Sequence, residues 1–80
     1  MRKFAIKTHK LWNKAPRIKE EKNVVGTYDN YTRARYEVEK LLNKYYEDMN
    51  VYKIFDISYN VWAIILDGEV ICIKIEEVWQ

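Results

Sequence analysis

The side chains best suited to nucleophilic or acid–base catalysis at neutral pH each occur once in this sequence. His9 is the only histidine and Cys72 is the only cysteine. Nothing near either residue along the chain supplies a Ser-His-Asp or Cys-His arrangement, which nucleophilic catalysis requires. Cys72 stands between Ile71 and Ile73, so we expect it to be a small buried hydrophobic residue. We therefore predict that the protein is not an enzyme.

Metal and phosphate sites are not indicated either. One Cys and one His are too few for a structural zinc site, which usually has four such ligands. The adjacent carboxylates Glu20-Glu21 and Glu76-Glu77 would point to opposite faces of a strand, so neither pair readily shares one ion. The two glycines are isolated, and no glycine-rich phosphate loop is present. We predict no metal and no small-molecule cofactor.

A basic N-terminal quarter is the main indication of a charged ligand. Residues 1–22 contain eight Lys or Arg and two Glu, a net charge of +6, whereas residues 23–80 have a net charge of −4. Cations interspersed with an aromatic ring suit a phosphate backbone and stacked bases. The sequence has neither an RNP-type aromatic motif nor a GXXG loop. A nucleic-acid-binding module is therefore the alternative function, with these candidate residues: Lys7, Lys10, Trp12, Lys14, Arg17, Lys19 and Lys22.

The C-terminal third predicts a β-hairpin that turns at Asp67-Gly68. An Asp-Gly pair between two apolar runs is a strong signal for a two-residue turn in which both central residues have φ > 0. This turn places Ile65 opposite Val70 and Ile64 opposite Ile71. One face then carries Trp62, Ile64, Leu66, Ile71, Ile73 and Ile75, and the other carries Val61, Ala63, Ile65, Val70 and Cys72.

A second turn, at residues 59–60, would join a strand of residues 51–58 to this hairpin. It places Phe55 opposite Ile64 on the first face and Ile54 opposite Ile65 on the second face.

One helix and two more strands are predicted upstream. Apolar residues at steps of three and four form one stripe over residues 31–49, with Asn30 or Asp29 as the N-cap and Asn50 as the stop. Residues 3–9 and 23–28 are typical of strands, and residues 13–22 of a charged loop. We predict one α+β domain over residues 1–80 in the order β-β-α-β-β-β, with a mostly antiparallel sheet of four or five strands and one helix packed on one face.

A sheet with two apolar faces needs two covers, and one helix supplies only one. We therefore predict a protein-binding or self-associating surface formed by Ile54, Val61, Ile65, Val70 and Trp79. The competing interpretation is that the first strand and loop cover this face themselves with Phe4, Ile6, Leu11 and Trp12.

Composition also bears on the source and the cellular location of the protein. Lys outnumbers Arg ten to four, and Ile, Asn and Tyr are plentiful, as in proteins from AT-rich genomes. In size and composition the chain resembles phage- or virus-encoded inhibitors of host or defence proteins, and the resemblance implies steric blocking of a host protein. The longest apolar run, residues 61–66, is too short to span a membrane, and the N-terminus lacks a signal-peptide core. We expect a cytoplasmic location, the host cytoplasm if the protein is phage- or virus-encoded.

Overall fold

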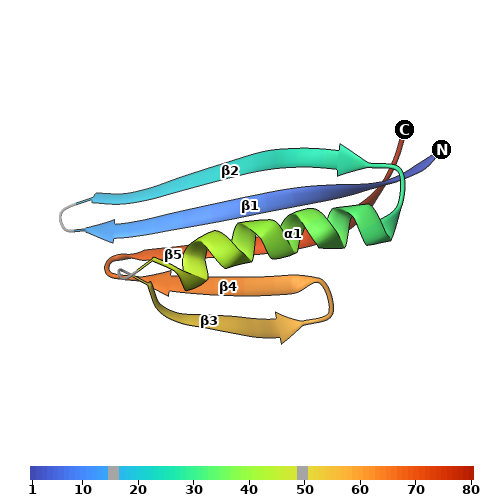
Figure 1. Cartoon of the computed structure of the whole chain (residues 1–80). Coiled ribbons are helices and arrows are strands. Elements are labelled where there is room, and N and C mark those ends of the chain that lie inside the picture. Colours follow the sequence, from blue (N-terminus) through green and yellow to red (C-terminus); the bar gives the residue numbers. More distant parts are fainter. Residues whose placement is uncertain (15–16, 49–50) are drawn as a thin grey trace.

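The chain folds into two layers, a five-stranded sheet and one helix, in the computed structural model (Figure 1). The structure describes residues 1–14, 17–48 and 51–80, with the backbone alone for residues 13, 14, 17 and 18. The predicted α+β class and element order are confirmed. The elements are β1 (Arg2–Lys14), β2 (Arg17–Tyr28), α1 (Tyr31–Tyr46), β3 (Val51–Ser58), β4 (Val61–Leu66) and β5 (Glu69–Trp79).

All neighbouring strands are antiparallel, in the order β2-β1-β5-β4-β3. The helix α1 follows β2 at one edge of the sheet and precedes β3 at the other edge (Figure 1). Its 16 residues are about 24 Å long at 1.5 Å per residue. Five strands about 4.8 Å apart span about 19 Å. One helix can thus cross the sheet from edge to edge, but it covers only one face.

The core lies between α1 and the sheet. The apolar stripe of the helix is confirmed, because Ala34, Val38 and Leu42 are buried on its inner side. The first face of the predicted hairpin is also confirmed as the core face. No polar or charged residue is buried among the described residues, so the core is held by apolar packing alone. The buried cluster consists of Ile6, Ala34, Val38, Leu42, Trp62, Ile64, Ile71, Ile73 and Ile75.

The predicted pairing of β4 with β5 is confirmed, with Ile65 opposite Val70 and Ile64 opposite Ile71. The predicted turn type at Asp67-Gly68 was wrong in one respect. Gly68 has φ 72°, but Asp67 has no positive φ, and a type I′ turn requires it at both central residues. The preceding turn follows the same rule, because Asn60 has φ 65° and Tyr59 does not. A positive φ at the second central residue alone is the sign pattern of a type II turn, and Gly and Asn are the residues that tolerate it.

The predicted register of β3 was wrong by one residue. The strand is irregular between Asp56 and Ser58, so Ile57 forms a bulge. As a result Ile54 lies opposite Ile64 and packs against the core, whereas Phe55 lies opposite Ala63 on the other face. A bulge adds one residue to one strand, and here this exchanges the faces of residues 53–56, as far as the second irregularity at Tyr52.

The predicted loop of residues 13–22 is mostly strand. β1 continues to Lys14 and β2 begins at Arg17, while residues 15–16 lie outside the described part of the chain. The two strands pair without interruption from the Lys14 and Arg17 pair to the Thr8 and Asn23 pair. Backbone pairing and opposite charges placed face to face, such as Lys10 and Glu21, stabilise this region without an apolar pattern.

The start of α1 is fixed as predicted. The Oδ1 of Asn30 accepts a hydrogen bond of 2.8 Å from the backbone N–H of Arg33, which is the N-cap interaction. The helix ends at Tyr46, three residues before the predicted end, and the predicted stop at Asn50 lies outside the described residues. Within the described residues, no helix is long and apolar enough to cross a membrane.

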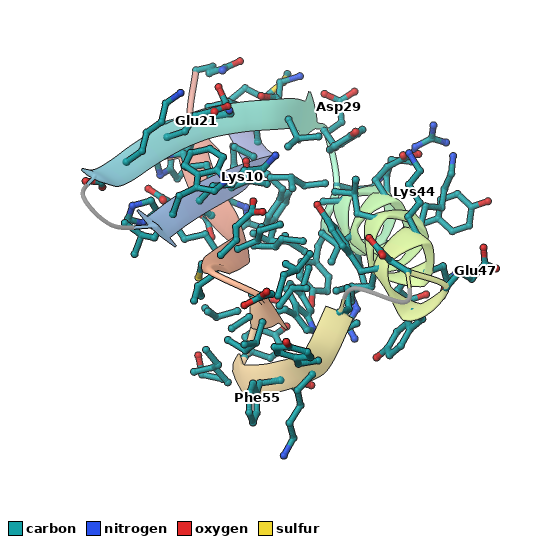
Figure 2. The ribbon with its side chains drawn as sticks, turned by 90° about the vertical axis from the view of Figure 1, so that its left-hand side faces the viewer. Lys10, Glu21, Asp29, Lys44, Glu47 and Phe55 are labelled. Carbon is teal, nitrogen blue, oxygen red and sulfur yellow. The ribbon has the colours of Figure 1, made fainter. Side chains whose placement is uncertain are left out.

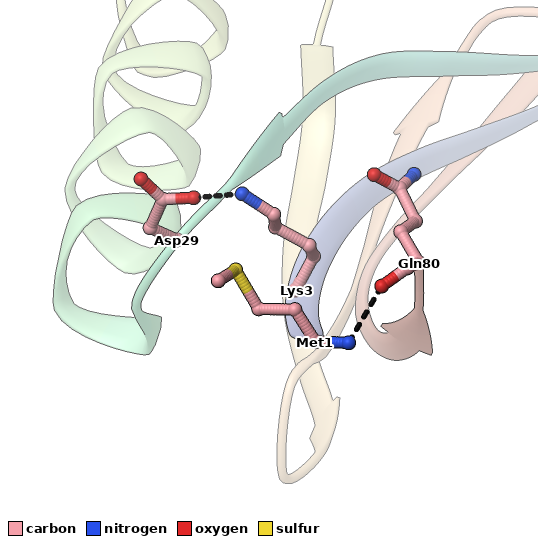
Figure 3. A network of polar contacts seen from close by, with 4 residues as sticks. All are labelled: Met1, Lys3, Asp29 and Gln80. Carbon is pink, nitrogen blue, oxygen red and sulfur yellow. Dashed lines mark hydrogen bonds and ion pairs between the residues drawn. The ribbon is translucent and has the colours of Figure 1, made fainter.

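Polar contacts join the start of β1 to the end of β5 and to the residue before the N-cap of α1 (Figure 3). The amino group of Met1 donates to the carbonyl of Gln80 at 2.6 Å, and the N–H of Gln80 donates to the carbonyl of Met1 at 2.9 Å. The ammonium of Lys3 pairs with the carboxylate of Asp29, just before α1. The first strand is therefore fastened to β5 and to the helix entrance at the same end of the sheet.

Candidate interaction surface

The face of the sheet that is turned away from α1 carries no second layer in the described part of the chain (Figure 2). We call it the open face. β1 lies within the sheet between β2 and β5, and its Ile6 joins the helix-side core. The interpretation that the first strand covers the open face is therefore wrong. That interpretation required β1 to leave the plane of the sheet, and its pairing with both neighbours prevents this.

Apolar residues gather on the open face over the half of the sheet made by β5, β4 and β3. Residues directly opposite one another in antiparallel strands share a face. One row therefore runs from Leu11 through Val70 to Ile65, and the next from Cys72 through Ala63 to Phe55. Leu11 and Phe55 are 40% exposed and Val70 is 38% exposed. We define the open-face patch as Leu11, Phe55, Val61, Ala63, Ile65, Val70 and Cys72.

The structure brings together three of the five predicted protein-binding residues. Val61, Ile65 and Val70 lie in the open-face patch. Ile54 does not, because the β3 bulge turns it toward the helix side, where it packs against the core. Trp79 is 75% exposed, but it lies four residues beyond Ile75 on β5 and so belongs to the helix side at the end of the sheet.

Two residues of the patch were not predicted to be part of this face, for different reasons. Phe55 was assigned to the wrong face by one residue of register, and no sequence signal marked the bulge at Ile57. Leu11 was predicted to cover the open face, but it is part of that face because β1 is longer than predicted. The apolar pair Leu11-Trp12, directly after the predicted strand, could have indicated that the strand continues.

A basic groove adjoins the patch on the open face. Its volume is about 490 Å³, and it is lined by Lys7, Thr8, His9, Lys22, Asn23, Val24, Cys72 and Lys74. Carboxylates offset most of its charge. The Nζ atoms of Lys7 and Lys74 each lie 3.2 Å from Oε2 of Glu76, and these two ammonium groups, with Lys7 contributing most, lower the pKa of the Glu76 carboxyl. Glu20 lies 3.6 Å from Nζ of Lys22.

The predicted nucleic-acid residues do not form one surface. Lys7 and Lys22 lie at the groove on the open face. Lys10 lies opposite Ile71, and Trp12 lies opposite Lys19 and Glu69, so these three residues belong to the helix side. The side chains of Lys14 and Arg17 lie outside the described part of the structure. The division follows from strand geometry, because alternate residues point to opposite faces.

The only histidine and the only cysteine are cross-strand neighbours, which the sequence did not indicate. His9 lies directly opposite Cys72 on the open face. Nε2 of His9 lies 2.5 Å from Oε1 of Glu20, without hydrogen-bond alignment, and Nε2 has no hydrogen-bond partner. Among the described residues, no hydrogen bond joins Cys72 to His9, and no group of three acidic, His or Cys residues could hold a metal ion. The pair lacks the nucleophile–base contact that would mark an active site.

Comparison of the chain with known protein families, with curated proteins and with solved structures finds no match.

Proposed function

We propose that this chain is a non-catalytic protein-binding domain that docks on its partner through the open-face patch. The observation that carries the proposal is that this apolar area lies on a sheet face with no second layer of the described chain, where Leu11, Phe55 and Val70 are exposed. Contiguous exposed apolar surface on a small domain is characteristic of interaction sites. Lys53 and the lysines of the groove flank the patch and would supply the polar rim that such interfaces have.

The mechanism that fits this surface is steric. A rigid sheet face that covers a partner's working surface blocks it without chemistry, as the likeness to phage- and virus-encoded inhibitors implies. The domain would act in the cytoplasm, that of the host if it is phage- or virus-encoded. It would need no cofactor, because shape and burial supply the affinity.

The proposal is tested with Ile65→Glu and Val70→Glu. Each carboxylate can reach water in the free domain, because Val70 is exposed and Ile65 is half-buried, but would be buried without a partner charge in the complex. That burial costs about 2 kcal/mol or more, so the partner affinity is expected to fall at least about 30-fold. The partner is first captured from the native host with the wild-type chain, and its Kd is then measured with each variant.

A control is Tyr36→Glu, which changes a residue on the outer side of α1 that is 56% exposed, against 38% for Val70. Its affinity should equal that of the wild type. Circular dichroism confirms that all three variants are folded. If the two open-face variants stay folded and bind the captured protein as well as the control does, the open face is not the working surface.

A nucleic-acid-binding module is the alternative function, and the gathering of Lys7, Lys22 and Lys74 around one groove is the observation that favours it. Binding of a single strand would weaken with salt by a log–log slope of about −0.7 per phosphate contacted. The double variant Lys7→Gln and Lys74→Gln should reduce this slope by about 1.4, whereas Lys44→Gln, on α1, should not change it. Fluorescence anisotropy with a labelled oligonucleotide measures the slope, and no binding at about 50 mM salt would exclude the module.

A further inference from the structure

The two edges of the sheet differ in how they are protected. The β2 edge carries the exposed charged run Lys19, Glu20, Glu21 and Lys22, together with a bulge near Val25. Charges and bulges are the usual means by which proteins prevent an edge strand from pairing with another chain.

The β3 edge carries exposed apolar side chains beside the charged residues Lys53 and Asp56, and its two irregularities leave the short segment 53–56 regular between them. Tyr52 is 71% exposed, Ile57 is 60% exposed and Phe55 is 40% exposed. Phe55 points away from the body of the molecule at this edge (Figure 2). Lys53 is the cation of this edge, and its Nζ lies 4.7 Å from the centre of the Phe55 ring.

The register of β4 determines which backbone groups of β3 remain free. Leu66 and Glu69 close a two-residue turn, so they form a hydrogen-bonded pair, and hydrogen-bonded and non-bonded pairs alternate from there. The backbone groups of Ile64 therefore point toward β5, and those of Ala63 point toward β3.

The same alternation continues into β3. Phe55 lies opposite Ala63, so its N–H and C=O groups point inward to β4. Ile54 and Asp56 consequently direct their N–H and C=O groups outward, to the free edge. Both lie in the regular segment between the irregularities at Tyr52 and Ile57.

We propose that a second copy of this chain pairs with the β3 edge, forming a symmetric dimer with a continuous ten-stranded antiparallel sheet. The outward N–H and C=O groups of Ile54 and Asp56 can pair with the same groups of a second copy when a two-fold axis perpendicular to the sheet passes beside Phe55. Ile54 of each copy then forms a hydrogen-bonded pair with Asp56 of the other, and the two Phe55 side chains meet at the axis. This inference depends on the backbone of the β3 edge and shares only Phe55 with the open-face patch.

The same features make the assembly close at two copies. The bulges at Tyr52 and Ile57 stop the regular pairing on both sides of the axis, and the β2 edge is charged. Each copy thus offers one competent edge, and a contact made by the same surface on both copies cannot extend into a fibre.

The dimer is tested first by the mass of the full chain in solution. Sedimentation equilibrium from about 1 µM to about 500 µM should give a mass that rises from 9.8 kDa to twice that value. Asp56→Pro removes one outward N–H and should hold the mass at that of one chain, whereas Asp56→Asn should dimerise as the wild type does.

Cross-linking provides a test that does not depend on whether the proline variant folds. In a Cys72→Ser background, Phe55→Cys places the two new thiols in a non-hydrogen-bonded pair, with Cα atoms about 4.5 Å apart, within disulfide range. Lys53→Cys is the matched control on the same strand and face, and its two thiols would lie about 13 Å apart along the strands. Phe55→Cys should therefore oxidise to a disulfide-linked dimer, and Lys53→Cys should not.

Three results would overturn the inference. The first is a wild-type mass of one chain at every concentration. The second is equal cross-linking of the Phe55→Cys and Lys53→Cys variants. The third is a dimer that Val70→Glu abolishes and Asp56→Pro leaves intact, since the two copies would then meet through the open face. If the wild-type chain is a monomer and Asp56→Pro abolishes binding of the captured host protein, the β3 edge binds that protein and not a second copy.

Discussion

Replacement of Ile64 by alanine is expected to remove about 2–5 kcal/mol from the free energy of unfolding. Ile64 is fully buried in the cluster between α1 and the sheet. Its truncation removes buried methyl groups and leaves a cavity that close packing on every side prevents from collapsing. A domain of this size is expected near the low end of about 5–15 kcal/mol, so the variant should be barely folded at room temperature.

The neighbouring change Ile65→Ala is the matched control. It lies on the same strand, removes the same atoms and changes strand propensity equally, but it lies on the open face. Since Ile65 is only half-buried, its truncation should cost about 1 kcal/mol. Urea unfolding of both variants measures the difference. Equal losses would mean that the two faces of β4 are equally covered, which contradicts a single-layer open face.

Truncation of Trp62 is expected to have a similar or larger effect, about 3–5 kcal/mol for Trp62→Ala. Its side chain is 3% exposed, the largest in the buried cluster, and the guanidinium carbon of Arg35 lies 4.8 Å from the centre of its ring. The variant therefore loses both buried area and a cation–π contact between α1 and β4.

Trp79→Ala removes the same side chain from an exposed position at the end of β5 and should change stability by less than about 0.5 kcal/mol. Thermal and urea unfolding, followed by far-ultraviolet circular dichroism because the tryptophan signal itself changes, give the comparison. A large loss of unfolding free energy for Trp79→Ala, or a small loss for Trp62→Ala, would contradict the assignment of Trp62 to the core and of Trp79 to the surface.

The parts of this fold that could be predicted are those in which one face is buried. The register of β4 on β5 follows from Asp67-Gly68 and from apolar residues that must alternate correctly to reach the core. The stripe of α1 and its cap at Asn30 follow from equally local rules. In each case a shift by one residue would expose the core, so the sequence pattern carries the information.

The parts that could not be predicted are those in which the two faces differ little. At the far end of the β1–β2 hairpin both faces carry charges, so the pattern resembled a loop although the backbone pairs. In β3, apolar residues occupy Ile54, Phe55 and Ile57 in turn, and only the bulge decides which of them faces the helix. The predicted face was therefore correct for Val61, Ile65 and Val70, where the register was certain, and wrong for Ile54.

The position of β5 also constrains how the molecule is made. This strand is the last of the five in chain order, yet in the described sheet it alone joins the β1–β2 hairpin to the β3–β4 hairpin. Until it arrives, neither hairpin has a strand neighbour that could complete the sheet, and closing the chain between β1 and β5 spans almost its whole length. The sheet should consequently form only when all five strands are available, in one cooperative and comparatively slow step rather than piece by piece.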